Sequence, residues 1–163
     1  MKTLIDNIIK QFNEVQEGKI WIGENFKKKL DTINEDQAFT RPIPTLHSVA
    51  ELISHLTVWR KETILKIKTG EGSLTDDCNE NWLNNTELKP MGWKKILTEY
   101  QNSLSEIIQL IQNKEDEFLT EEYYDTDFKG YYQYSFVIEG MLHHDIYHLG
   151  QIGIVIKLLK ENK

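Results

Sequence analysis

Two histidines, His144 and His148, stand four positions apart in a strongly apolar segment near the end of the chain. In an α-helix, four residues advance the backbone by about 6 Å and leave about 40° of net rotation, so both imidazoles project from one face. The spacing indicates that this face is turned toward a core rather than toward water. The other residues assigned to it are Val137, Gly140, Met141, Tyr147, Gln151, Val155 and Leu158. Buried polar side chains need a partner, and one metal ion would serve both histidines.

A third histidine, His55, meets the same description on a different segment. Ser48 and Glu51 have the spacing of a capping box, which begins a helix. On that helix, His55 falls within the inner stripe that Leu52 and Leu56 define. Three inward histidines predict a site for one divalent ion whose remaining positions are open to water or substrate, as in catalytic zinc sites.

The alternative is that each histidine is an ordinary hydrogen-bonded core residue, which is the commoner case for any one of them alone. Three converging imidazoles would need several separate acceptors, whereas one ion satisfies a nitrogen on each. We therefore favour the metal site. His47 precedes the helix cap, and His143 is rotated by about 100° from His144. Both are expected to be non-ligands.

The histidines must be positioned by long helices, of which the sequence predicts four. Apolar residues recur at helical spacing over 5–30, 48–69, 93–111 and 135–160. We expect the first helix to end before Asn34 and the second to end at Gly70. No alternating strand pattern competes with these helices. The chain is therefore predicted to be all-α, a four-helix bundle that forms one domain over 1–163.

Two predicted connections, 71–90 and 114–134, are unusually long, and loops of such length are often functional or mobile. The first is polar and acidic, with Trp82 as its one aromatic residue. The second holds many rings, which either cap one end of the bundle or form a wall of a substrate pocket. They are Phe118, Tyr123, Tyr124, Phe128, Tyr131, Tyr132 and Tyr134.

Charge and composition exclude several classes of function. The 163 residues include 19 Lys and Arg against 26 Asp and Glu, a formal charge of −7, which argues against a nucleic-acid-binding face. Cys78 is the single cysteine, so no intrachain disulfide is possible, and its acidic neighbours disfavour a reactive thiolate. No apolar run is long enough to span a bilayer or to form a secretory core. We expect a cytoplasmic protein that binds neither membrane nor nucleic acid.

The segments 48–55 and 144–152 together resemble the DinB-like superfamily, and the resemblance extends over nearly the whole chain, including Arg41 and Pro42. That superfamily comprises small four-helix bundles that include bacillithiol S-transferases and mycothiol-dependent enzymes. The resemblance implies that His55, His144 and His148 bind one metal ion, usually zinc or nickel. It also implies a possible homodimer.

The leading hypothesis is a mononuclear metal enzyme that transfers a low-molecular-weight thiol of the bacillithiol type to an electrophilic small molecule. The alternatives are a metal-dependent hydrolase and a non-catalytic, metal-stabilised small-molecule-binding or stress-associated module. Tyr147 and Gln151 are the candidates for orienting substrate, with ordinary packing as the competing interpretation. Asp145 imitates the acidic residue of a His-Glu-x-x-His zinc protease, but its helical position and short side chain disfavour that role.

Overall fold

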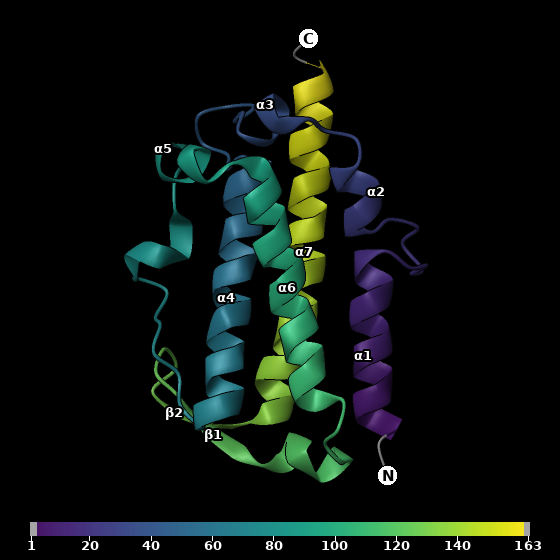
Figure 1. Ribbon diagram of the computed structural model, residues 1–163, viewed down its shortest axis with the longest axis vertical. Coiled ribbons are helices and arrows are strands. Elements are labelled where there is room, and N and C mark those ends of the chain that lie inside the picture. The colour runs from purple at the N-terminus through teal and green to yellow at the C-terminus, as the bar shows by residue number, and fades with distance from the viewer. Residues whose placement is uncertain (1–2, 162–163) are drawn as a thin grey trace.

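Helices dominate the computed structural model, which describes residues 3–161. The longer helices are α1 (Thr3–Gln16), α4 (Val49–Thr69), α6 (Trp93–Ile111) and α7 (Tyr134–Glu161). The short ones are α2 (Phe26–Leu30), α3 (Glu35–Ala38), α5 (Asn85–Leu88) and the 3-10 turns Asn79–Trp82, Lys89–Met91 and Asp116–Thr120. The four long helices run along the long axis of the molecule (Figure 1), and α4 packs most extensively against α6 and α7. The predicted four-helix bundle is confirmed.

Local signals at both ends of α4 act as the sequence predicts. The Ser48 hydroxyl accepts from the Glu51 amide at 3.2 Å, and the Glu51 carboxylate accepts from the Ser48 amide at 2.8 Å. These two bonds satisfy amides that have no partner within the helix. At the other end, Gly70 has φ +78°, the left-handed conformation that glycine adopts without steric cost. The position of His55 along the bundle is therefore fixed by its own helix ends.

The continuous first helix predicted over 5–30 is wrong. α1 ends at Gln16, and the chain does not become helical again until Phe26. Gly23 has φ +75°, which a helix cannot contain, and Asn25 caps the new helix by accepting from the amide of Lys28 at 2.8 Å. The apolar spacing continues through the break at Ile22, but that side chain is 52% exposed, so the pattern there does not mark a core.

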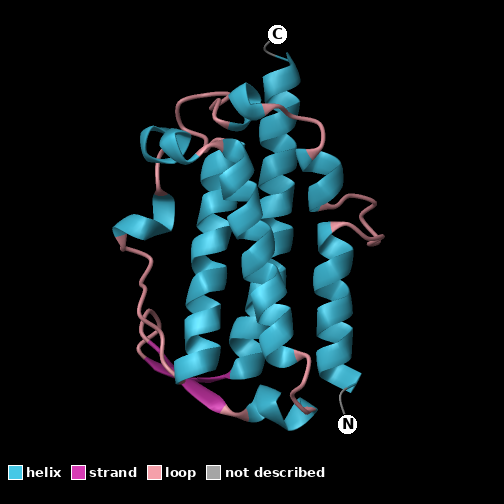
Figure 2. Ribbon diagram, viewed as in Figure 1, coloured by secondary structure: helices cyan, strands magenta, loops and turns pink. Residues whose placement is uncertain are grey.

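A β-hairpin that the sequence reasoning missed closes one end of the bundle. Its strands, β1 (Glu122–Asp125) and β2 (Gly130–Gln133), pair antiparallel, and Figure 2 shows them as the only strands drawn. Each strand has four residues, too few for the alternating pattern to stand out. Asp125 organises the turn by accepting from the amides of Asp127 and Phe128. Backbone bonds join Tyr124 to the residues just after α4.

The two long connections are structured rather than open. The aromatic residues of the segment 114–134 include Phe118, Tyr123 and Tyr134, whose buried rings stack at the end of the bundle. These three rings cap the bundle, whereas Phe128 and Tyr131 of the same segment are 59% and 71% exposed. Part of the segment 71–90 packs against α4, which contacts the 3-10 turn Asn79–Trp82 and the short helix α5. No helix in the described part of the chain is both long enough and apolar enough to cross a membrane.

Candidate metal centre

The fold brings His55 of α4 together with His144 and His148 of α7. The Nε2 atom of His144 lies 3.0 Å from Nε2 of His55 and 2.9 Å from Nε2 of His148. The ligand atoms of all three lie within 4.8 Å of one another. Two nitrogens that are each about 2.1 Å from one ion lie at most about 4.2 Å apart, and both measured pairs meet this condition. The fold therefore brings the three predicted histidines together as a group that could hold one metal ion.

Hydrogen bonds at the far nitrogens decide which nitrogen faces that point. His55 Nδ1 donates to the backbone carbonyl of Asn81 at 3.0 Å. A carbonyl oxygen can only accept, so neutral His55 carries its proton on Nδ1 and presents a lone pair at Nε2. His148 Nδ1 donates in the same way to the side-chain oxygen of Gln151 at 2.7 Å. Partners of this kind orient histidine ligands in metal sites.

The donor set fits a divalent cation. His144 Nε2 lies between the lone pairs of His55 and His148, and a single N–H could be directed fully at only one of them. A metal ion would instead accept a lone pair from each ring. His144 Nδ1 is buried without a hydrogen-bond partner, whereas the Nδ1 atoms of His55 and His148 each have one. Among the described residues, this is the group of histidine, cysteine and acidic side chains that could hold a metal.

Burial keeps the three imidazoles neutral. Desolvation lowers the pKa of His144 from 6.5 to about 3 and that of His148 from 6.5 to about 4. The pKa of His55 is lowered for the same reason. The mutual proximity of the rings acts in the same direction. Neutral imidazole is the form that binds metal, so the site is ready for an ion at neutral pH.

These pKa values predict how the metal-free protein responds to acid. Below pH 6.5 the histidines of the unfolded chain take up protons, whereas buried His148 stays neutral to about pH 4. The unfolded state then binds more protons, so the free energy of unfolding should fall as the pH drops through this window. Urea titrations of the chelated protein at several pH values measure this fall in the free energy of unfolding. His148→Gln should reduce the fall and exposed His143→Gln should not; equal falls in both variants would contradict the assignment.

His47 and His143, predicted to be non-ligands, lie outside the group of three. The ring of His47 stacks on Trp82, with centroids 3.9 Å apart. The opposite face of Trp82 stacks on His55 at 3.8 Å. Trp82 is the one aromatic residue of the polar segment 71–90. Its ring covers one face of His55, a proposed metal ligand.

Asn81 is a site residue that sequence reasoning missed. Besides the carbonyl that holds His55, its side-chain oxygen accepts from the Trp59 indole at 2.8 Å, and its side-chain nitrogen donates to the Asp76 carbonyl at 2.7 Å. These bonds fix the 3-10 turn against α4. No local pattern could have revealed this role, because it depends on how residues far apart in the sequence meet.

Gln151 and Tyr147, the two candidates for orienting substrate, differ in their surroundings. Gln151 contacts His148 directly and so positions a proposed ligand. Tyr147 is 63% exposed, which contradicts its predicted place on the inward face, although its ring lies 5.0 Å from that of His148. The helical rotation of about 100° per residue carries Tyr147 away from the core while its neighbour remains inside.

Asp145 and Arg60 form a buried ion pair behind the histidines. Their side chains are each 1% exposed, and Arg60 Nη2 lies 2.6 Å from Asp145 Oδ2. Arg60 also donates to the hydroxyl of Tyr100, which donates to Gln16. Burial raises the pKa of Asp145, and the guanidinium of Arg60 opposes that shift. Asp145 therefore joins α7 to α4, which is inconsistent with the general base of a zinc protease. The helical spacing of Leu56 and Arg60 was the signal that sequence reasoning overlooked.

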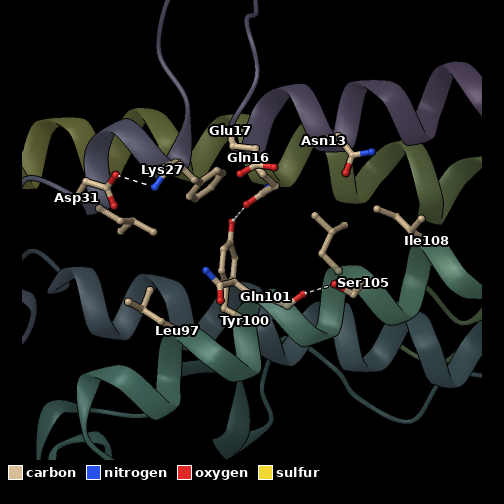
Figure 3. A pocket seen from close by; sticks show the side chains of 13 residues that line it. Asn13, Gln16, Glu17, Lys27, Asp31, Leu97, Tyr100, Gln101, Ser105 and Ile108 are labelled. Atoms are coloured by element: carbon tan, nitrogen blue, oxygen red, sulfur yellow. Dashed lines mark hydrogen bonds and ion pairs between the residues drawn. The ribbon is translucent and has the colours of Figure 1, made fainter.

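A cavity of about 360 Å³ lies on the outer side of this network, between α1, α2 and α6. Figure 3 shows the Tyr100 hydroxyl reaching across it to Gln16. The three histidines do not line this cavity. A second cavity, of about 510 Å³, is lined by His55 and His144 and is therefore the one that adjoins the candidate metal centre.

Fold and site together define a helical-bundle protein with a candidate three-histidine metal centre. The family model of the DinB superfamily matches residues 21–152, and this chain belongs to that superfamily. The expected family is confirmed. No curated protein matches the chain.

Solved structures with the same fold share little sequence with it. A conserved protein from Enterococcus faecalis superposes with a TM-score of 0.71 at 15% identity, covering 97% of each chain. A DinB-like protein, YjoA, from Bacillus subtilis gives a TM-score of 0.64 at 15% identity, covering 94% of this chain and 92% of that one. YfiT from Bacillus subtilis, described as a probable metal-dependent hydrolase with an unusual four-helix bundle topology, gives 0.70 at 13% identity, covering 98% and 90%.

Proposed function

We propose that this protein is a mononuclear metal-dependent enzyme whose ion, zinc or nickel, is held by His55, His144 and His148. The observation that carries the proposal is the convergence of three Nε2 atoms, with the two closest pairs at 2.9 and 3.0 Å. Three protein ligands leave further positions of the ion for substrate or water, which is the pattern of catalytic rather than structural zinc sites.

The reaction that we propose is transfer of a low-molecular-weight thiol of the bacillithiol type to an electrophilic small molecule. A divalent ion in such a site lowers the pKa of a thiol or water that it binds and so supplies a nucleophile near neutral pH. Asn81 and Gln151 hold two of the rings in the neutral form that donates through Nε2. Trp82 covers His55 and excludes water from that ring face.

Hydrolysis is the second candidate, because the similar fold of YfiT is described as that of a probable metal-dependent hydrolase. The same three histidines would then activate water instead of a thiol. A binding module without turnover is the third. We propose that the protein acts on its small-molecule substrate in the cytoplasm. That it forms a homodimer is also a prediction.

Chelation separates these functions. We expect removal of the ion to abolish activity while far-ultraviolet circular dichroism changes little, because an extensive buried core holds the bundle. Small zinc-finger domains behave otherwise, since they lack such a core. The untagged protein should be loaded with zinc or with nickel and its metal content measured. It should then be assayed for conjugation of a thiol to an electrophile and for hydrolysis of esters and amides.

Restoration of thiol conjugation by added metal would support the leading proposal, and restoration of hydrolysis alone would favour the second. Full metal content without either activity would favour the binding module. Cooperative unfolding on chelation would mean that the site is chiefly structural.

A further inference from the structure

The cavity of about 510 Å³ beside the candidate metal centre has a wall composition that restricts what it can bind. It lies between α4, the hairpin and the first half of α7, and His55 and His144 form part of its lining. Its volume is in the range of small-molecule sites. Both long connections contribute to it, the first through Asp76 and the second through Asp127 and Phe128.

The cavity offers no free cation to an anionic ligand. Lys66 is the one lysine or arginine among the described residues that line it. Its ammonium lies 2.8 Å from Asp125 and 3.9 Å from Glu62, and its side chain is 4% exposed. The Tyr123 hydroxyl also donates to Asp125. Lys66 is thus committed to a buried ion pair that anchors the hairpin to α4.

Three more acidic residues line the cavity, and among the described residues of its lining no lysine or arginine pairs with them: Asp76, Asp127 and Glu139. One oxygen of Asp127 accepts from the backbone amide of Asp76 at 2.9 Å, which holds the two acidic residues together across the hairpin and the first connection. Glu139 approaches from α7. The field inside a cleft lined by one sign of charge attracts ligands of the opposite sign.

Aromatic rings supply the apolar part of the wall. Phe128 and Phe136 are 59% and 47% exposed, and their ring centroids lie 5.6 Å apart at an interplanar angle of 77°. Trp59 also lines the cavity. Large apolar side chains left this exposed beside a cavity gain stability when a ligand covers them. The faces of such rings also attract ammonium groups.

We propose that the electrophilic or hydrolysed substrate of this site is a small molecule with an aromatic or aliphatic body and a cationic amine or ammonium group. The inference rests on the proposed metal-dependent function. The carboxylates of Asp76, Asp127 and Glu139 recognise the cation, and Phe128 and Phe136 cover the body. His144 lines the same cavity, so a substrate bound there reaches the proposed ion.

Binding of three compounds that share a benzyl group tests the charge preference. Benzyltrimethylammonium is the cation, benzyl alcohol is neutral and benzylsulfonate is the anion. Titration calorimetry on the zinc-loaded protein should give a Kd for the cation at least about tenfold below that for the anion. Benzyl alcohol should lie between them, and added salt should narrow the difference. A sulfonate that binds as tightly as the ammonium, or an ammonium that does not bind at millimolar concentration, would overturn the inference.

Charge-removing variants locate the preference in the cavity. Glu139→Gln and Asp76→Asn should each raise the Kd of benzyltrimethylammonium several-fold and leave that of benzyl alcohol nearly unchanged. Glu80→Gln removes the same charge from an exposed position that does not line the cavity, and it should leave all three values unchanged. If Glu80→Gln has the same effect as Glu139→Gln, general surface charge explains the preference and the inference fails.

Metal analysis of every sample separates this inference from the proposed function. A wild-type protein that takes up no zinc or nickel refutes the metal-dependent function. If the protein holds its full metal content but binds benzylsulfonate more tightly than benzyltrimethylammonium, only the proposed substrate class is refuted.

Discussion

Replacing His148 by alanine should remove most of the bound metal, and the same result is expected for His55→Ala and His144→Ala. Each ring supplies one Nε2 atom to the point where the three converge, so any one loss leaves two ligands. Elemental analysis of untagged protein, dialysed against a fixed free-zinc concentration, measures the effect. We expect the metal content to fall from about one ion per chain to a small fraction of that.

Two other histidines provide matched controls for these variants. His47→Ala and His143→Ala remove imidazoles that lie close to the site but outside the group of three. Both should retain nearly full metal. Near-stoichiometric zinc in His148→Ala would disprove the ligand assignment, and loss of zinc in His143→Ala would show that the ligand set is different.

Asp145→Ala is expected to lower the free energy of unfolding by about 3–5 kcal/mol, because it leaves a buried guanidinium without its anion. Both side chains of the pair are 1% exposed, and the contact distance is 2.6 Å. Urea unfolding of the metal-free protein at pH 7 measures the loss without a contribution from metal binding. The double variant Arg60→Met with Asp145→Leu should recover much of it, since apolar pairs often replace buried ion pairs without loss.

An exposed ion pair that joins α4 to α6, instead of α4 to α7, gives the comparison. Lys61 and Glu99 lie 2.9 Å apart with side chains 57% and 31% exposed. Glu99→Ala should cost only about 0–1 kcal/mol, because water replaces the lost partner. If Asp145→Ala cost no more than Glu99→Ala, the buried pair would not be the link that holds α7 against α4.

Local interactions explain which parts of the structure the sequence predicts well. Ser48, Glu51 and Gly70 determine the ends of α4 through hydrogen bonds and backbone conformation within a few residues. His144 and His148 share a face because the helical repeat places positions four apart on one side. The helices 93–111 and 135–160 likewise follow from their apolar spacing, and the structure has them as Trp93–Ile111 and Tyr134–Glu161.

Tertiary structure alone decided the remaining features. The hydrogen bond from His55 to Asn81 and the ion pair of Arg60 with Asp145 join residues far apart in the sequence. The break at 17–25 also escaped the pattern, because apolar spacing does not reveal which residues find a core to pack against. The sequence by itself therefore determined three of the four long helices and the helix faces that carry His55, His144 and His148. Packing between helices and loops determined the third histidine's partners, the charge around them and the cavity, since these depend on contacts that no local pattern encodes.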